Sequence, residues 1–455
     1  MRKIIQYMMM ALIAVVLASC ANDISEESTP TVKSNIRFVV DDFPMFEKPS
    51  TRTIGEEDKG KTAWAVGDEI CVKLESKELG TQTATLKYNG VKFEIQDGNS
   101  LCYLDGEPVT AYAYYAPNRR WRNGSLDFKD IYGNPNGTAE FLEATCTVHY
   151  GDNNYVDISF ANATRNYSRL RIATIPKTEI KVDADNFAPT DNPNLLYMTY
   201  TLTSDEKGNA YLYGTFDNNS IATVKYRGAS LATHKFSKKT ENAKSYALDA
   251  TVISANSAEE IYSAIKQEIA DGKTAIRLNL ASDAGDNEFK AIREAFKNVK
   301  SGTIDLTLIG CKEIPADGLK DLTALKSISL PDVTKIGKNA LLYCVNLQEI
   351  YAPNVSAIDE YAFGSCYYLR KVTLGKLTDV RGEANSRSGI FDDINDLNPY
   401  IDLYLPKNQE VMKGEFDNNS NQYIWKPTGE SYFASPDYDD GIFLDYQFNS
   451  VKSWE

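Results

Sequence analysis

The chain has 455 residues, enough for several domains that each bury a core of their own. Its formal net charge of −14 argues against nucleic-acid binding, because lysine and arginine side chains must neutralise the phosphates in such complexes. The two histidines are His149 and His234, so mechanisms that need several histidines are nearly excluded.

Residues 1–34 predict a targeting segment followed by a tether. Two basic residues precede an apolar run from Ile4 to Ala18, which is too short to span a membrane comfortably. The run ends in LASC, which resembles the lipobox of bacterial lipoproteins, whose cysteine becomes the acylated first residue after cleavage. This resemblance implies a lipoprotein signal peptide over 1–19, lipidation at Cys20 and a flexible tether over 20–34. An ordinary signal peptide with an incidental cysteine is the alternative.

The acidic residues behind Cys20 resemble the surface-export signals of lipoproteins in Gram-negative gut and oral anaerobes. The resemblance implies a protein that is lipid-anchored in the outer membrane and exposed at the cell surface. No later apolar run is long enough to cross a bilayer, so we expect the lipid anchor to be its contact with the membrane.

Residues 35–250 predict β-structure, because short alternating segments are separated by turns and helical periodicity is almost absent. The clearest element is a hairpin over 83–96, with Asn89 and Gly90 at its turn. Strands and turns of this length predict one or two β-sandwiches. We expect two, over 35–150 and 151–250.

Three phrases in this region resemble the first domain of fimbrillin-like proteins, the pilins and adhesin stalks of the same anaerobes. They are STRT (50–53), WAVGDEICV (64–72) and AYAYYAP (111–117). The stretch DISFANATRNYSRLRIATIP (157–176) resembles the opening of the second fimbrillin domain. Ordinary sandwich strands and turns are the alternative for each phrase.

The resemblance also gives a meaning to Arg52. In polymerising fimbrillins a protease cuts after an arginine near the first strand, and the exposed groove accepts a strand from a neighbouring subunit. Arg52 sits at the matching place. We favour an ordinary surface arginine, because a large C-terminal domain would burden a repeating shaft subunit.

The stretch GEEDKGKT, residues 55–62, satisfies the phosphate-loop pattern but does not predict nucleotide binding. That loop needs a buried strand before it and a helix after it, whereas EKPSTRTI precedes this one and a strand-like segment follows. Its three acidic residues would also repel a triphosphate.

Residues 251–302 predict a helical cap. Ser257 and Glu260 form a capping box before an apolar helix face, and Gly272 ends that helix. A second helix carries four apolar residues on one face and stops near Gly302.

Residues 303–410 contain an internal repeat of 22 residues. IGKNALLYC, which begins at Ile336, is followed 22 residues later by IDEYAFGSC, which begins at Ile358. Such a period predicts a solenoid, in which each coil buries its apolar side against the next. Cys344 and Cys366 then fill the same interior position as free, buried thiols. The segment 411–455, with Trp425 and an alternating stretch near its end, is expected to close the solenoid as a C-terminal cap.

The repeated pattern L-x-x-I-x-L-P-x-V-x-x-I-x-x-x-A-F-x-x-C-x-x-L resembles the BspA-like class of leucine-rich repeats. The match is specific in the two central coils and departs from the pattern in the last coil, where GEANSRSGIFDDINDLNPY interrupts the register. One short strand recurs in each coil, and its alternation directs six side chains outward together. These predicted binding residues are Ser327, Ser329, Glu349, Tyr351, Lys371 and Thr373, which Asp402 and Tyr404 could extend.

The sequence predicts no enzyme, cofactor or metal site. It contains no G-x-S-x-G or H-E-x-x-H motif, and the six cysteines after Cys20 lack zinc-ligand spacing. DYDDG, residues 437–441, lacks the full spacing of a calcium loop and predicts a solvated turn.

The predicted fold is therefore a β-rich multidomain chain with an α/β part, in which two fimbrillin-like sandwiches precede a short capped leucine-rich repeat. The predicted function is non-catalytic adhesion through the repeat face, with a host or bacterial surface protein, or a glycan, as partner. The alternative is a fimbrial anchoring or tip subunit that assembles with other fimbrial subunits through its sandwiches.

Overall fold

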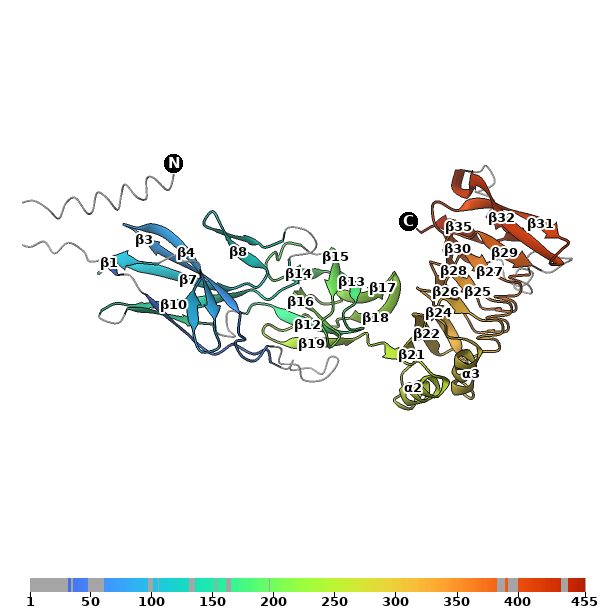
Figure 1. The fold of residues 1–455 in the computed structure, drawn as a ribbon, viewed down its shortest axis with the longest axis horizontal. Helices are drawn as coiled ribbons and strands as arrows, with labels where there is room; N and C mark the ends of the chain where they lie inside the picture. Colours follow the sequence, from blue (N-terminus) through green and yellow to red (C-terminus); the bar gives the residue numbers. More distant parts are fainter. Residues whose placement is uncertain are drawn as a thin grey trace, which may run out of the picture.

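The chain is a β-rich multidomain protein with three hydrophobic cores among its described residues. The computed structural model describes residues 32–33, 36–47, 61–96, 101–104, 106–130, 136–151, 154–160, 165–195, 197–382, 389–391, 400–434 and 441–454. Cys20, Arg52, the predicted signal peptide and most of the phosphate-loop and DYDDG stretches lie outside these residues. The two β-sandwich units and the repeat follow one another in a row (Figure 1).

The first unit is built on one seven-stranded sheet. In spatial order its strands are β2 (Arg37–Val40), β11 (Tyr155–Ser159), β10 (Leu142–His149), β7 (Val109–Tyr115), β3 (Glu69–Ser76), β4 (Gly80–Tyr88) and β5 (Phe93–Ile95). Neighbouring strands are antiparallel except β2 and β11, which are parallel. Two small pairs complete the unit, namely β1 (Val32–Lys33) with β6 (Tyr103–Leu104) and β8 (Arg119–Arg122) with β9 (Ser125–Phe128).

The predicted hairpin at Asn89 is confirmed, with a longer turn than the sequence suggests. β4 and β5 are antiparallel, and four residues, 89–92, connect them. The Asn89 side chain accepts hydrogen bonds from the backbone N–H groups of Val91 and Lys92 at 2.9 and 3.0 Å, which holds the turn. Gly90 has φ 101°, a backbone conformation that glycine adopts without steric cost.

Two predicted boundaries need correction. β11 follows residue 150, yet it pairs with β10 and its Val156 and Ile158 belong to the first core. The change of core falls between Tyr167 and Leu170 instead. In addition, β1 lies inside the predicted tether and pairs with β6, so the last residues of that segment join the fold.

The second unit is a sandwich of two four-stranded sheets. One sheet has the order β14 (Phe187–Pro189), β16 (Asn209–Phe216), β12 (Ser168–Ala173) and β19 (Ser245–Asp249). The other has the order β15 (Tyr197–Thr203), β13 (Glu179–Asp185), β17 (Ile221–Tyr226) and β18 (Ala229–Lys235). Alternate residues of these strands are buried, as expected when each sheet turns one face to the shared core.

Two helices begin the third unit, as predicted. α2 (Ala258–Ala270) has Ser257 at its N-cap, whose side chain accepts a hydrogen bond from the Glu260 N–H. α3 (Asp286–Ala295) buries Phe289 and Ile292 against the core of the repeat. The helices accompany the first two strands of the repeat sheet, β20 (Ile253–Ser254) and β21 (Ala275–Asn279).

The repeat forms two sheets around one core. The first sheet has eight strands, all parallel: β20, β21, β22 (Ile304–Ile309), β24 (Leu325–Ser329), β26 (Glu349–Ala352), β28 (Lys371–Leu374), β30 (Asp402–Leu405) and β35 (Ser450–Ser453). The second has the order β23 (Glu313–Ile314), β25 (Lys335–Ile336), β27 (Ala357–Ile358), β29 (Asp379–Gly382), β32 (Gln422–Ser431) and β31 (Glu410–Asp417). The first sheet faces the second sandwich and the second sheet faces away from it (Figure 1).

The interior positions of the coils hold the repeated apolar residues, as the 22-residue period predicts. Ile328, Ile350 and Val372 are fully buried and pair across three adjacent strands. Cys344 and Cys366 are buried free thiols that donate to the backbone carbonyls of the preceding coil.

The C-terminal segment closes the last coil. Trp425 in β32 is buried in the core of the repeat, and β35 adds the eighth parallel strand. A short pair, β33 (Ile442–Phe443) with β34 (Tyr446–Gln447), and the short 3-10 helix η2 (Tyr432–Ala434) pack beside it. In the described part of the chain, no helix combines the length and apolar character needed to span a membrane.

Candidate functional site

The predicted binding residues lie on the outer side of the eight-stranded sheet, in two rows fixed by strand pairing. The first row comprises Ser327, Glu349, Lys371 and Asp402. The second row comprises Ser329, Tyr351, Thr373 and Tyr404. Because the strands are parallel and in register, equivalent residues of successive coils stand side by side.

The first row is polar, and its side chains form hydrogen bonds with one another and with their neighbours. The Lys371 ammonium donates to the Glu349 carboxylate at 2.6 Å, and the Ser327 hydroxyl donates to Asp305 at 2.6 Å. Asp402 accepts hydrogen bonds from Ser450 and Asn449, which tie it to the C-terminal segment. The bond from Ser450 is the main reason that the pKa of Asp402 is lowered, with the bond from Asn449 and the nearby Lys452 adding to the effect.

The prediction that Thr373 points freely into solvent is wrong. Thr373 is only 4% exposed. Strand pairing places it between Tyr351 and Tyr404, whose larger side chains shield a threonine on the same face. The indole of Trp454 also lies at this strand, because it donates to the Leu374 carbonyl at 3.0 Å.

Tyr404 carries two cations over its ring. The ammonium groups of Lys371 and Lys452 each lie 5.7 Å from the ring centroid. Both are within the range of favourable cation–π contact. This end of the face therefore combines an aromatic ring with two lysines, each of which also pairs with an acid, Glu349 or Asp402.

Tyr351, the predicted anchor, does not stand free in solvent. A Cβ atom built on Gly228 of the second sandwich would overlap the Tyr351 hydroxyl, so the two residues are in close contact. Burial raises the pKa of Tyr351. Beside this contact, Arg227 forms an ion pair with Asp332 of the repeat. In Figure 1 the β17 and β18 strands reach toward this part of the sheet.

Sequence reasoning missed Arg227, Gly228 and Asp332. The stretch TVKYRGASL alternates on both sides of Arg–Gly, so it contained the signal for a hairpin with a two-residue turn. Nothing in the sequence indicates that this turn meets the repeat, since that contact arises only when two domains are placed in space.

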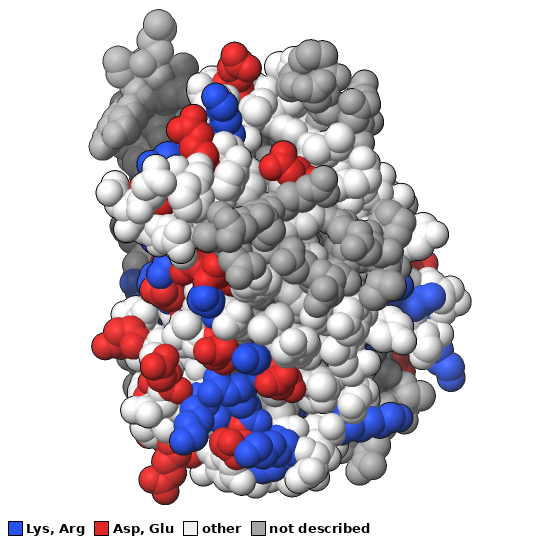
Figure 2. All heavy atoms as spheres, turned by 90° about the vertical axis from the view of Figure 1, so that its right-hand side faces the viewer, with Lys and Arg blue, Asp and Glu red and all other residues white. Residues whose placement is uncertain are grey.

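The opposite face of the repeat has a charge ladder across its coils. Lys335 lies 2.7 Å from Glu313 and 3.6 Å from Asp359, and Arg381 lies 3.0 Å from Asp379. Figure 2, which looks onto this side, shows acidic and basic side chains interspersed. Within the ladder, each described charge lies beside one of opposite sign.

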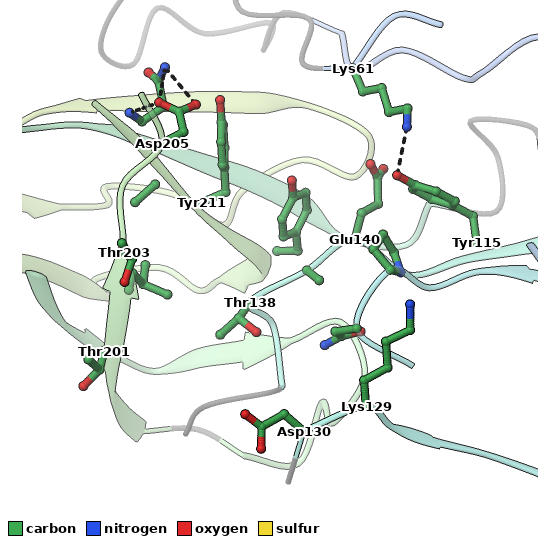
Figure 3. Close-up of a pocket in the computed structure, with 17 residues that line it drawn as sticks. Lys61, Tyr115, Lys129, Asp130, Thr138, Glu140, Thr201, Thr203, Asp205 and Tyr211 are labelled. Carbon is green, nitrogen blue, oxygen red and sulfur yellow. Dashed lines mark hydrogen bonds between the residues drawn. The ribbon is translucent and has the colours of Figure 1, made fainter. Parts of the chain in front are cut away.

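A cleft of about 660 Å³ lies between the two sandwiches (Figure 3). Lys61, Tyr115, Glu140 and Tyr211 are among its lining residues. Its charged groups already have partners, since Lys61 pairs with Asp68 and Glu140 with the buried Arg165.

The histidines occupy unrelated places in the sandwiches. His149 stacks on Tyr155 and bonds to Asp157 at 2.9 Å, and burial lowers the pKa of His234. Within the described ranges, no group of three or more His, Cys, Asp or Glu side chains could hold a metal ion.

Comparison with solved structures finds distant resemblances. A candidate cell-adhesion protein from Bacteroides fragilis NCTC 9343 matches with a TM-score of 0.23 and 11% identity, over 48% of this chain and 93% of that one. A shaft pilin, SpaA from Lactobacillus rhamnosus GG, matches with a TM-score of 0.16 and 12% identity, over 48% of this chain and 96% of that one.

Comparison by sequence finds a family that the repeat resembles. No curated protein matches the chain. Residues 290–395 match the BspA type leucine rich repeat region, with six copies. The match covers the coils whose period, strands and buried cysteines are described above, so this part of the chain is similar to BspA-type leucine-rich repeats.

Proposed function

We propose that the chain is a non-catalytic cell-surface lipoprotein that adheres to a protein of a host or bacterial surface through the outer face of its eight-stranded sheet. The observation that carries this proposal is the register of that sheet. It presents two rows of polar and aromatic side chains on backbones that neighbouring strands hold. A face of this kind loses little conformational entropy on binding.

The residues proposed to contact the partner would contribute different kinds of interaction. Ser327, Glu349 and Lys371 form the polar first row, and Tyr351 supplies apolar area together with a hydroxyl. Tyrosine is among the residues that most often dominate binding energy in interfaces. A glycan is the other partner class that such a face could bind, since aromatic rings and paired polar groups also suit sugars.

A matched pair of variants tests the face. Glu349→Ala with Lys371→Ala removes one glutamate–lysine pair from the proposed face, and Glu313→Ala with Lys335→Ala removes an equivalent pair from the opposite face. In an adhesion assay with whole cells or immobilised host proteins, we expect the first variant to bind roughly tenfold more weakly, about 1.4 kcal/mol. The second variant should bind like the wild type. Equal adhesion by both variants would place the site elsewhere.

The anchor is a separate proposal. Cys20 lies outside the described residues, and its lipobox context supports acylation. We expect Cys20→Ala to abolish sedimentation with membranes, and protease added to intact cells to remove the wild-type protein. Membrane association that survives in the variant, or wild-type protein that resists the protease, would contradict the proposal.

A fimbrial subunit is the second candidate function, and one observation favours it. β2 and the buried Phe43 and Phe46 precede Arg52 in the chain, and β2 forms one edge of the seven-stranded sheet. Cleavage at Arg52 would therefore cut the covalent link between an edge strand and the rest of the sheet, which is the first step of strand exchange between subunits.

A further inference from the structure

The tip of the β17–β18 hairpin reaches the repeat face from the second sandwich. The two strands are antiparallel, and Arg227 and Gly228 alone connect them. Gly228 lies against the Tyr351 hydroxyl, and Arg227 forms an ion pair with Asp332. The turn therefore touches the repeat at one aromatic and one acidic side chain.

Arginine is an unusual residue for this turn. Arg227 and Gly228 have φ 46° and 84°, the two left-handed positions of a type I′ turn, where Asn–Gly is a preferred pair. The β8–β9 hairpin uses that pair, Asn123 and Gly124, at φ 51° and 79°. A bulky side chain is unfavourable in the left-handed region, so Arg227 points to a contact that needs its guanidinium.

Asp332 is placed in the repeat to receive a cation. Its side chain is 3% exposed, and one oxygen accepts a hydrogen bond from the Gly310 N–H at 2.9 Å while the other faces Arg227. The equivalent positions of the next two coils hold Asn354 and Lys376, so the acid belongs to this coil and not to the repeat pattern. A buried carboxylate is costly without a positive partner.

The remaining contact restricts the position after the arginine to glycine. Within the hairpin itself, the Arg227 guanidinium lies 5.3 Å from the centroid of the Tyr226 ring. At the next position the Tyr351 hydroxyl occupies the space that a Cβ would need. Any residue larger than glycine would have to displace Tyr351.

We propose that Asp332 and Tyr351 form a recognition site for an arginine–glycine turn, which the β17–β18 hairpin occupies within the chain and which a protein partner with such a turn occupies in its place. The inference rests on the proposed binding function and names the chemistry of the partner. Attachment to the same chain gives the hairpin a high effective concentration at the site. Interfaces between domains of one chain are commonly weak enough to open, so exchange is physically accessible.

Occupancy by the hairpin is tested with Arg227→Asn in the full-length chain. This change removes the ion pair while creating the preferred Asn–Gly turn, so it cannot act by weakening the hairpin. We expect hydrogen exchange in 349–352 to become about tenfold faster, within the usual range of coupling between sites. Hydrogen exchange in 349–352 that stays at the wild-type rate would overturn the proposal that the hairpin occupies the site.

Two glycine variants provide a matched control. Gly228→Ala and Gly124→Ala place a Cβ on the same left-handed backbone, but only the first meets Tyr351, since nothing lies within 4 Å of a Cβ at Gly124. Gly228→Ala should reproduce the faster exchange in 349–352, and Gly124→Ala should not. Equal exchange in both variants would attribute the effect to turn strain and overturn the inference.

Recognition in trans is tested with a fluorescent, disulfide-cyclised peptide that copies residues 221–235. It should bind full-length Arg227→Asn about tenfold more tightly than the wild type, whose site is occupied. Adding Asp332→Asn, or replacing the peptide's arginine by glutamine, should abolish that binding. Equal binding to wild type and Arg227→Asn, binding that survives Asp332→Asn, or no binding to either chain would each overturn recognition.

The outcomes separate this inference from the proposed function. Loss of adhesion in the Glu349→Ala, Lys371→Ala variant, together with no effect of Arg227→Asn on exchange or peptide binding, would leave the binding face in place and remove the turn site. Peptide binding that depends on Asp332, together with normal adhesion by the Glu349→Ala, Lys371→Ala variant, would retain the turn site and move the adhesive surface.

Discussion

At the scale of single residues, burial decides what the cysteines of the repeat can do. The Cys344 thiol is fully buried and donates to the Leu319 carbonyl at 3.2 Å, and the Cys366 thiol donates to the Leu341 carbonyl at 3.3 Å. Burial raises the pKa of Cys344 to about 12 and holds that of Cys366 well above its ordinary value. A thiol that stays protonated and covered is neither a nucleophile nor a metal ligand, so these residues act as small core side chains.

The burial of Cys344 and Cys366 as free thiols can be tested by alkylation and by substitution. Iodoacetamide at pH 8 should not modify Cys344 or Cys366 in the native protein. The reactive thiolate is almost absent at a pH far below the raised pKa values of these thiols. Cys366→Ala should lower the free energy of unfolding by roughly 1 kcal/mol through a small cavity. Mass spectrometry after non-reducing digestion gives the decisive control, since a peptide that joins Cys344 to Cys366 would contradict the free-thiol assignment.

At the scale of elements, the repeat could be predicted because one coil dictates the next. Ile328, Ile350 and Val372 recur at the period of the fold, and their burial follows from that recurrence. Thr373 follows the same alternation, yet its exposure depends on the size of Tyr351 and Tyr404 beside it. Alternation gives the direction of a side chain but not the space that its neighbours occupy.

The pairing of strands that are distant in the chain could not be predicted from the sequence, for a similar reason. The alternation in β11 identifies a strand without identifying its sheet, so the pairing of β11 with β10 and β2 could not be derived from the chain order. The contact of Gly228 with Tyr351 is of the same kind, because it joins two domains. Both rows of the proposed face were therefore predictable from the repeat, while the cover that the hairpin places over Tyr351 was not.

The last strand of the repeat depends on one charged residue. Asp402 in β30 accepts hydrogen bonds from Ser450 and Asn449, at the start of β35, and so helps to hold that strand. Asp402→Asn removes the charge from these bonds and should lower the free energy of unfolding by about 1 kcal/mol at pH 7. Asp445→Asn changes the same charge at an exposed residue and serves as the control.

The pH dependence of this effect has a definite sign. The pKa of Asp402 is lowered on folding from its ordinary value of 3.8, mainly by the bond from Ser450. A lowered pKa means that the stabilisation is present above the unfolded value and is lost as the pH falls through the folded value. Urea unfolding should therefore separate wild type from Asp402→Asn at pH 7, and the difference should shrink toward pH 3. A difference that stays constant over this range would show that the charge of Asp402 is not its source.

At the scale of the whole molecule, the proposed binding face of the eight-stranded sheet is directed toward the sandwiches. The eight-stranded sheet is turned to the second sandwich, and β30 and β35 extend past the hairpin that meets Tyr351 (Figure 1). Tyr404 and Lys452 lie on these two strands, and Lys371 lies on the adjacent β28. A partner would therefore approach along the side of the molecule, and the sandwiches would limit its size.

The same arrangement argues against growth of a fibre from this chain. A fimbrial subunit must lose its first strand, yet β2 pairs with β11 over four residues and Phe43 and Phe46 are buried in the first core. Glu47 adds an ion pair to Lys244 of the second sandwich. These contacts should retain the N-terminal segment after a cut at Arg52, because buried aromatic side chains and strand pairing do not depend on chain continuity there.

We therefore expect cleavage at Arg52 to leave a monomer. Purified protein treated with an arginine-specific protease should yield two fragments that elute together in gel filtration and separate only under denaturing conditions. Arg52→Lys removes that cleavage site and distinguishes it from cuts at other arginines. Multimer ladders that appear on unboiled gels with the wild type, disappear on heating, and are absent with Arg52→Lys would contradict this expectation, because they would show that the vacated edge beside β11 accepts a strand from another copy.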